Sequence, residues 1–194
     1  MHDFLFYIEL GLDHVLDLGA YDHILFLSAL ALPFTFKHWK KVLILATVFT
    51  LAHCLSLALS AYGVVQVDVG MIEFLIPVTI LLTALFNFVH IRNQELEVGL
   101  SLHILATAFF GLIHGFGFSN YFRMLIAGEQ DMVVPLLGFA TGIELSQVTV
   151  ILLVLALSQL IVNVLKVKRP VYIALASLLV IGITIRLLIS TFPW

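Results

Sequence analysis

Charged residues and cysteine are both scarce in this sequence. Only 11% of its 194 residues are Asp, Glu, Lys or Arg, and Cys54 is its one cysteine. A single cysteine excludes an intramolecular disulfide, and it leaves no thiolate array for a soft metal ion. The formal net charge of −3 gives no reason to expect nucleic acid as a partner. So little charge also argues against a soluble domain, in which about a quarter of the residues are charged.

Apolar residues dominate the rest of the chain. They account for 62% of it, and the mean hydropathy is +1.15. These values are typical of an integral membrane protein, so we expect an all-α fold that forms one transmembrane domain over residues 1–194. A helix that spans a bilayer needs about 20 apolar residues. Runs of that kind predict six spans, near residues 19–36, 42–62, 71–90, 99–118, 133–162 and 170–191.

The N-terminal segment, residues 1–18, has a different pattern. Phe4, Ile8 and Leu12 recur at a spacing of four, with acidic residues between them. This pattern predicts an amphipathic helix along the outer membrane interface, and a short re-entrant segment is the alternative. About 15 residues are too few to cross a bilayer comfortably. The segment lacks the basic start and the cleavage site of a secretory signal, so we expect it to be retained.

Basic residues are distributed unevenly over the predicted loops. The second and fourth loops carry only Arg123. The first, third and fifth loops carry Lys37, Lys40, Lys41, Arg92, Lys166, Lys168 and Arg169. Since positively charged loops stay in the cytoplasm, the odd-numbered loops are expected there and both termini on the outer side.

Five ionisable residues lie inside the predicted spans, where the bilayer penalises charge. They are Asp22, His23, His53, His114 and Glu144. At a rise of about 1.5 Å per residue, four helices bring them to similar depths in the outer half of the membrane. Imidazole and carboxylate groups bind divalent transition metals, so we predict a metal site, without distinguishing nickel, zinc, iron, cobalt or copper. The competing interpretation is that each histidine stabilises helix packing and that Asp22 caps the first span.

Several other polar residues are candidates of lower rank. His14 and Glu73 are secondary candidates for the metal site: an exposed polar face explains His14 equally well, and an interfacial position at the start of the third span is the alternative for Glu73. His90 and His103 fall near the predicted cytoplasmic side, where a structural or interfacial role is favoured. Arg186, deep in the last span, needs a partner that the sequence does not identify.

Glycines cluster in the fourth and fifth predicted spans. Gly111 and Gly115 lie in the fourth span, and Gly138 and Gly142 lie in the fifth. Small residues at a spacing of four allow two helices to approach closely. We therefore predict that these two spans touch, which would bring the fourth-span histidine toward the fifth-span glutamate.

Four stretches of the sequence together resemble the successive signatures of the HupE/UreJ family. They are Tyr21–Leu27, Phe49–His53, His114–Phe118 and Gly138–Leu145. The stretches occur in family order and cover most of the chain between about residues 13 and 150. One departure is Cys54, because the family more often has serine after this histidine.

The resemblance implies a small multi-helix protein of the bacterial inner membrane that acts as a permease for nickel or a related divalent metal. By the same resemblance, the five ionisable residues of the predicted metal site occupy the signature positions. Expected partners are membrane lipids and the metal ion, and a homo-oligomer is left open.

An enzyme is the alternative function. In an intramembrane metal-dependent hydrolase, three histidines would hold a metal that activates water. Asp22, Ser56 and Glu144 would then take part in catalysis. A purely structural membrane subunit ranks third.

Overall fold

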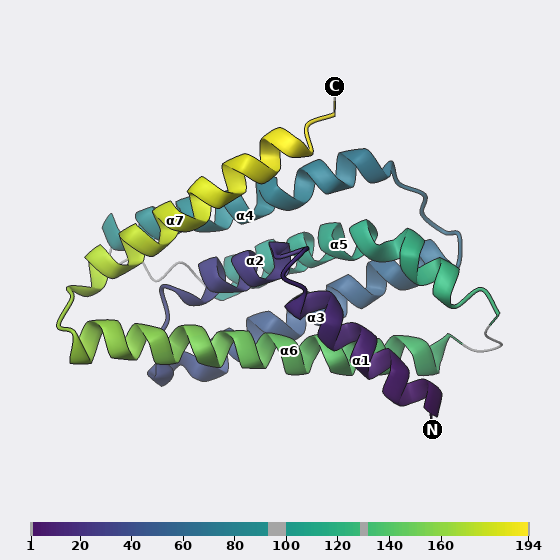
Figure 1. Cartoon of the computed structure of the whole chain (residues 1–194), viewed down its shortest axis with the longest axis horizontal. Helices are drawn as coiled ribbons and strands as arrows, with labels where there is room; N and C mark the ends of the chain where they lie inside the picture. The colour runs from purple at the N-terminus through teal and green to yellow at the C-terminus, as the bar shows by residue number, and fades with distance from the viewer. Residues whose placement is uncertain (1, 93–99, 129–131, 194) are drawn as a thin grey trace.

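The helices of the protein run largely along its long axis (Figure 1). A computed structural model describes residues 2–92, 100–128 and 132–193, and every regular element in these ranges is helical. Residues 93–99 and 129–131, which fall in two predicted loops, lie outside the described residues. The α-helices are α1 (His2–Leu16), α2 (Asp22–Ala31), α3 (Trp39–Ala61), α4 (Val69–Arg92), α5 (Leu100–Leu125), α6 (Val133–Gln159) and α7 (Arg169–Ser190).

Five of these helices, α3 to α7, are long and apolar enough to cross a membrane. They correspond to the second to sixth predicted spans. The first predicted span, over 19–36, is not one continuous helix, because α2 has only 10 residues. That is about half of what a bilayer requires. Large apolar side chains such as Leu105 and Leu153, 68% and 65% exposed, give the outside of the bundle a surface suited to lipid.

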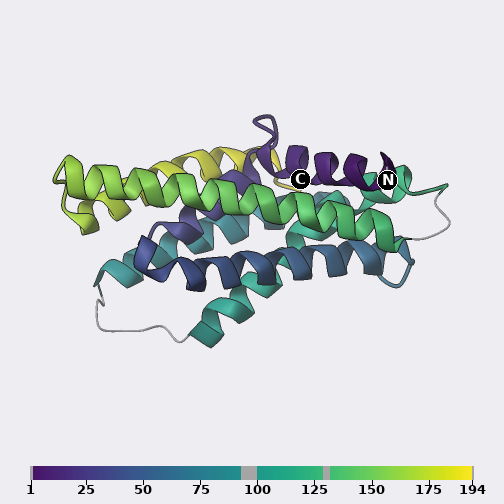
Figure 2. The same cartoon turned by 90° about the horizontal axis from the view of Figure 1, so that it is seen from below.

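α1 packs lengthwise against α6 (Figure 2). A side chain on Gly142 would collide with the backbone at Ile8, and one on Gly138 would meet Phe4. Four residues further along α6 the contact lies four residues further along α1, so the two helices run parallel. Glycine allows this backbone-to-backbone approach because it has no side chain. α1 therefore lies along one of the candidate membrane spans, and not flat across the end of the bundle.

A short break separates α1 from α2. The Asp17 carboxylate accepts a hydrogen bond from the Gly19 amide at 2.7 Å, which forms a tight turn. α2 then continues to the far end of the bundle, where the Asn87 amide nitrogen donates to the Ala29 carbonyl at 3.0 Å. Arg169 donates to the carbonyl of Pro33 at 2.8 Å just beyond. α1 and α2 therefore extend in succession from one end of the bundle to the other (Figure 1).

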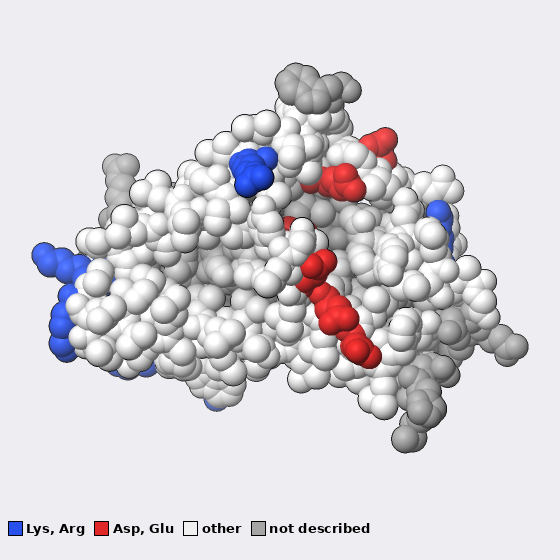
Figure 3. Space-filling view, in the orientation of Figure 1, with Lys and Arg blue, Asp and Glu red and all other residues white. Residues whose placement is uncertain are grey.

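The two ends of the bundle differ in charge. Lys and Arg side chains gather at the end where α2 and α6 finish, which we call the basic end (Figure 3, left). In the chain, Lys37, Lys40 and Lys41 follow α2, and Lys166 and Lys168 lie between α6 and α7. α1 begins at the opposite end, which we call the N-terminal end.

The glycines of the fourth predicted span pack against α3, not against α6. A side chain on Gly115 would collide with Ser56 and with the His53 carbonyl, and one on Gly111 would collide with Phe49. The glycines of α6, Gly138 and Gly142, pack against α1 instead. The two spans do touch as predicted, since the rings of Phe118 on α5 and Phe139 on α6 stack 5.2 Å apart. The contact is not made by the glycines, because each glycine row packs against a different helix.

Candidate metal centre

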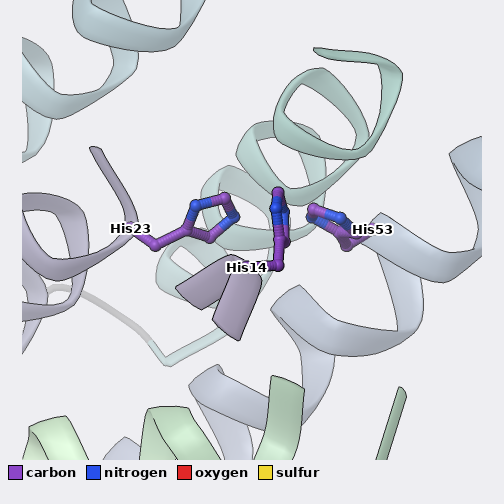
Figure 4. Close-up of side chains that lie close together, drawn as sticks. All are labelled: His14, His23 and His53. Carbon is purple, nitrogen blue, oxygen red and sulfur yellow. The ribbon is translucent and has the colours of Figure 1, made fainter. Parts of the chain in front are cut away.

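Four histidines from four helices meet where α1 ends and α2 begins. His14 lies in the last turn of α1 and His23 in the first turn of α2. The ring of His23 is 4.5 Å from that of His14, 5.5 Å from that of His53 on α3 and 5.1 Å from that of His114 on α5, measured between centroids. Figure 4 shows the rings of His14, His23 and His53 side by side.

The potential ligand atoms form two groups that share His23. In one group, atoms of His14, His23 and His53 all lie within 4.8 Å of one another. In the other, atoms of Asp22, His23 and His114 do the same. Such spacing is what three ligands around one transition-metal ion require after small side-chain adjustments. The shared histidine joins the two groups into one set of candidate metal ligands, Asp22 and the four histidines, which we call the metal cluster.

Three histidines of this cluster are buried, with 2% of His23, 0% of His53 and 1% of His114 exposed, and His14 is half-buried. Several of their ring nitrogens nevertheless have no hydrogen-bond partner among the described residues. These are Nε2 of His14, Nε2 of His23, both nitrogens of His53 and Nδ1 of His114. Buried polar atoms are normally paired, because an unpaired one costs about 1–3 kcal/mol. A metal ion bound by their lone pairs would satisfy these nitrogens together.

A threonine fixes which nitrogen of His114 carries the proton. The Thr79 hydroxyl donates to the Ile76 carbonyl at 2.7 Å, and it lies 3.0 Å from Nε2 of His114. A hydroxyl has only one hydrogen, so with that hydrogen directed to the Ile76 carbonyl the Thr79 oxygen is placed to accept from the imidazole N–H. Nδ1 of His114 therefore keeps its lone pair, and this is the nitrogen without a partner.

Asp22 acts on His23 in a similar way. Its Oδ1 lies 3.3 Å from Nδ1 of His23. A carboxylate accepts the Nδ1 proton, so Nε2 of His23 is the free nitrogen. Hydrogen bonds of this kind orient metal-binding histidines and raise their basicity.

A wide cavity leads to the metal cluster from one side of the bundle. Its volume is about 980 Å³, and His14, His23 and His114 are among the residues that line it. Its acidic lining residues are Asp13, Asp17, Asp22 and Glu73. No lysine or arginine of the described chain lines it, and Figure 3 shows acidic side chains on both sides of the hollow. We call this cavity the acidic vestibule.

His53 differs from the other three histidines because it does not line the vestibule. It is fully buried behind His14, and the rings are 5.4 Å apart. Phe49 and Phe139 flank it, with ring centroids 5.9 Å and 6.1 Å from its own. The vestibule therefore reaches three of the histidines directly, and the fourth lies behind them among aromatic rings.

Glu144 has other partners in this structure. Its carboxylate accepts hydrogen bonds from Thr47 and Thr50, each at 2.6 Å, and Gln147 donates to Thr50 at 2.7 Å. Thr50 lies one turn before His53 on α3, so Glu144 adjoins the metal cluster without entering either ligand group. That Glu144 binds the metal remains a prediction.

Other sequence candidates fall into three places. Glu73 lines the vestibule. Ser56 is fully buried and donates to the His53 carbonyl at 2.8 Å, so its hydroxyl hydrogen is engaged within its own helix. His90 and His103 line a separate cavity toward the basic end.

Sequence reasoning undervalued His14 and did not identify Thr79. His14 was difficult to rank because a helix break separates it from Asp22 and His23, and no periodicity runs across a break. A usable signal exists for Thr79: it is one of four polar residues that follow one face of an otherwise apolar helix.

No curated protein and no solved structure matches this chain. A family model described as HupE / UreJ protein matches residues 1–191, which is almost the full length. The protein is therefore a member of the HupE/UreJ family.

Proposed function

We propose that the protein is a permease for a divalent transition metal such as nickel. The observation that carries this proposal is the metal cluster itself: unpartnered imidazole nitrogens from four helices meet beside an acidic vestibule. Membership of the HupE/UreJ family points to the same kind of function.

The proposed orientation follows from charge. The basic end faces the cytoplasm, since positively charged loops are retained there. Both termini then lie on the periplasmic side of the bacterial inner membrane. α1 and α2 together serve as the sixth span, as two half-helices with a break beside the metal cluster. Discontinuous helices of this kind occur at ion sites of other transporters, where the break exposes polar groups.

The vestibule supplies the first step of uptake. Acidic residues in a cavity with low-dielectric walls raise the local concentration of a cation. Asp13, Asp17 and Glu73 do this before the ion reaches the histidines. The ion then exchanges its water ligands for imidazole nitrogens, while Asp22 contributes a compensating negative charge.

The ligand set defines the class of cargo. Neutral imidazole suits nickel, zinc, cobalt, iron and copper, whereas magnesium and calcium prefer oxygen ligands. Nitrogens dominate both ligand groups of the metal cluster. A first-row transition metal is therefore the proposed cargo, and calcium is the matched ion that should compete poorly.

The hydrolase alternative has less support. Its best candidate for a hydroxyl beside the metal, Ser56, is buried in the contact between α3 and α5 and is not among the residues that line the vestibule. A substrate held in the vestibule would meet Asp22 and histidines, without that hydroxyl. The alternative is retained as an outcome of the test.

The test combines metal content with flux. Purified protein is analysed for bound nickel, zinc and cobalt, and the same preparations are reconstituted into liposomes to follow uptake. His53→Ala is expected to lower flux at least tenfold, because it removes a ligand without opening the vestibule. His38→Ala is the control, since His38 is exposed in the basic loop and bonds to Thr35.

Two results would overturn the proposal. One is wild-type protein that holds metal but moves none, which would favour an enzyme or a static metal site. The other is equal flux in His53→Ala and His38→Ala, which would separate transport from the metal cluster.

A further inference from the structure

We propose that a second cavity, toward the basic end, is a release site for the transported metal ion, with His90 and His103 as its nitrogen ligands. The inference rests on the proposed transport function. It adds a second binding site and a barrier, Phe26, between the two sites.

The cavity lies between α2, α4 and α5 and has a volume of about 210 Å³. Its walls include Leu30, Leu82 and Phe86, which provide an apolar surround. Its polar lining residues are Thr83, Asn87, His90, His103 and Thr107. We call it the release cavity. After the acidic vestibule, it is the second cavity of the described residues that is lined by side chains able to bind a metal.

The polar residues of α4 form one stripe that joins the two sites. Thr79, Thr83, Asn87 and His90 are spaced by four, four and three residues, so they share one face of the helix. Thr79 contacts His114 of the metal cluster, and the other three line the release cavity. Thr83 donates to the Thr79 carbonyl at 2.8 Å, which keeps its hydroxyl on this helix.

α5 repeats the pattern in the opposite direction. His103, Thr107 and His114 share one of its faces, by spacings of four and seven. Thr79 and His114 are in contact, and His90 and His103 each lie eleven residues away along antiparallel helices. Eleven residues correspond to about 16 Å of rise. The shared register therefore sets His90 and His103 at the same depth.

Asn87, a lining residue of the release cavity, keeps an acceptor oxygen on its side chain. Its amide nitrogen donates to the Ala29 carbonyl at 3.0 Å and to the Ser177 hydroxyl at 3.1 Å. Both amide hydrogens are thereby used, so the side-chain carbonyl remains as an acceptor. Two imidazoles and a carbonyl can bind a transition metal. Without a carboxylate among its lining residues, this site binds less tightly than the metal cluster, as release requires.

Phe26 separates the two sites. Its ring lies 5.4 Å from that of His114, stacks on Phe49 at 4.9 Å and meets Phe110 edge to face at 6.1 Å. Phe26 and Phe110 also line the release cavity. Phe26 is fully buried. Phe26 therefore lies against His114 on one side and lines the release cavity on the other, which makes it the barrier between the two sites, whereas three histidines of the cluster line the vestibule directly.

The test of the release site uses the double variant His90→Ala/His103→Ala. Nickel flux into liposomes is expected to fall at least tenfold, while nickel bound to the metal cluster at low concentration stays at the wild-type level. His90→Gln/His103→Gln keeps the approximate size of the side chains, and it should show the same loss of flux with the same bound nickel. His38→Ala, a histidine at the same end outside the cavity, should retain wild-type flux.

Retained nickel content in the same samples shows that the variants are folded. Flux within twofold of wild type in both double variants would overturn the release site alone. A wild-type protein that binds nickel without flux would instead overturn the proposed function. The two failures are therefore distinguishable.

The barrier has its own test. Phe26→Ala is expected to raise passive nickel leakage through reconstituted protein at least threefold, because it joins the metal cluster to the release cavity. Phe109→Ala is the matched control, since Phe109 lies on α5 with 59% of its surface exposed. Equal leakage in the two variants would show that Phe26 is not the barrier.

Discussion

Thr79 shows how much a single hydroxyl decides in this site. Its own hydrogen goes to the Ile76 carbonyl, so it accepts from Nε2 of His114 and directs the lone pair of Nδ1 to the metal cluster. The sequence identified His114 through its residue type and depth. It did not reveal the tautomer, because that depends on a contact between α4 and α5 that is remote in sequence.

Replacing Thr79 should therefore weaken metal binding without unfolding the protein. Thr79→Val keeps the shape of the side chain and removes the acceptor, so the dissociation constant for nickel should rise about tenfold. Thr79→Ser should restore binding. Titration of nickel into purified protein measures the change, with Thr149→Val, an exposed threonine on α6, as the control. Wild-type affinity in Thr79→Val would contradict the role given to this hydroxyl.

Among the elements, the glycine rows decide which helices can bring ligands together. α5 approaches α3 at Gly115, directly beside His53, and α6 approaches α1 at Gly142. The sequence predicted that these glycines mediate close packing, and this is confirmed. The two glycine rows do not meet each other, because the assembled bundle packs one against α3 and the other against α1, while α5 and α6 touch through the stacked rings of Phe118 and Phe139.

A methyl group at position 115 should disturb both packing and metal binding. Gly115→Ala would drive a side chain into Ser56 and the His53 carbonyl, so α3 and α5 must separate. Overpacking of this kind costs about 1–3 kcal/mol. We expect a lower melting temperature in detergent and less bound nickel.

Gly182→Ala on α7 is the control for this prediction, since nothing lies within 4 Å of the side chain that it adds. It should unfold at the wild-type temperature or slightly above, because alanine favours a helix over glycine. If Gly115→Ala were as stable and bound as much nickel, the contact between α3 and α5 would not position His53.

For the whole molecule, the distribution of charge gives the bundle a direction. Lysines gather at the basic end, while Asp13, Asp17 and Glu73 line the vestibule. Both features were visible in the sequence as charges. Only the tertiary structure shows that the three acids, from α1, from the break after it and from α4, face one cavity.

Neutralising the vestibule should slow uptake without removing the metal cluster. In Asp13→Asn/Asp17→Asn/Glu73→Gln, initial uptake at limiting nickel is expected to fall about tenfold at low ionic strength, with a smaller loss in high salt. Glu9→Gln is the control, because this exposed acid of α1 does not line the vestibule. Salt-independent uptake equal to that of the control would contradict electrostatic attraction.

The sequence by itself determined the class of the protein and the positions of five candidate spans, and it predicted the chemical type of the site. These properties depend on composition and on apolar runs of about 20 residues, which are local features. It also set the depth of each candidate ligand, because rise along a helix follows directly from residue number. His23, His53 and His114 could be grouped on that basis alone.

The tertiary structure decided which side chains actually meet. Depth leaves the rotation and the neighbours of each helix undetermined, and these depend on packing between segments far apart in the chain. Packing brought His14 into the metal cluster, because α1 lies against α6 and ends beside α2. It gave Glu144 two threonine partners on α3, since α6 turns that face toward them.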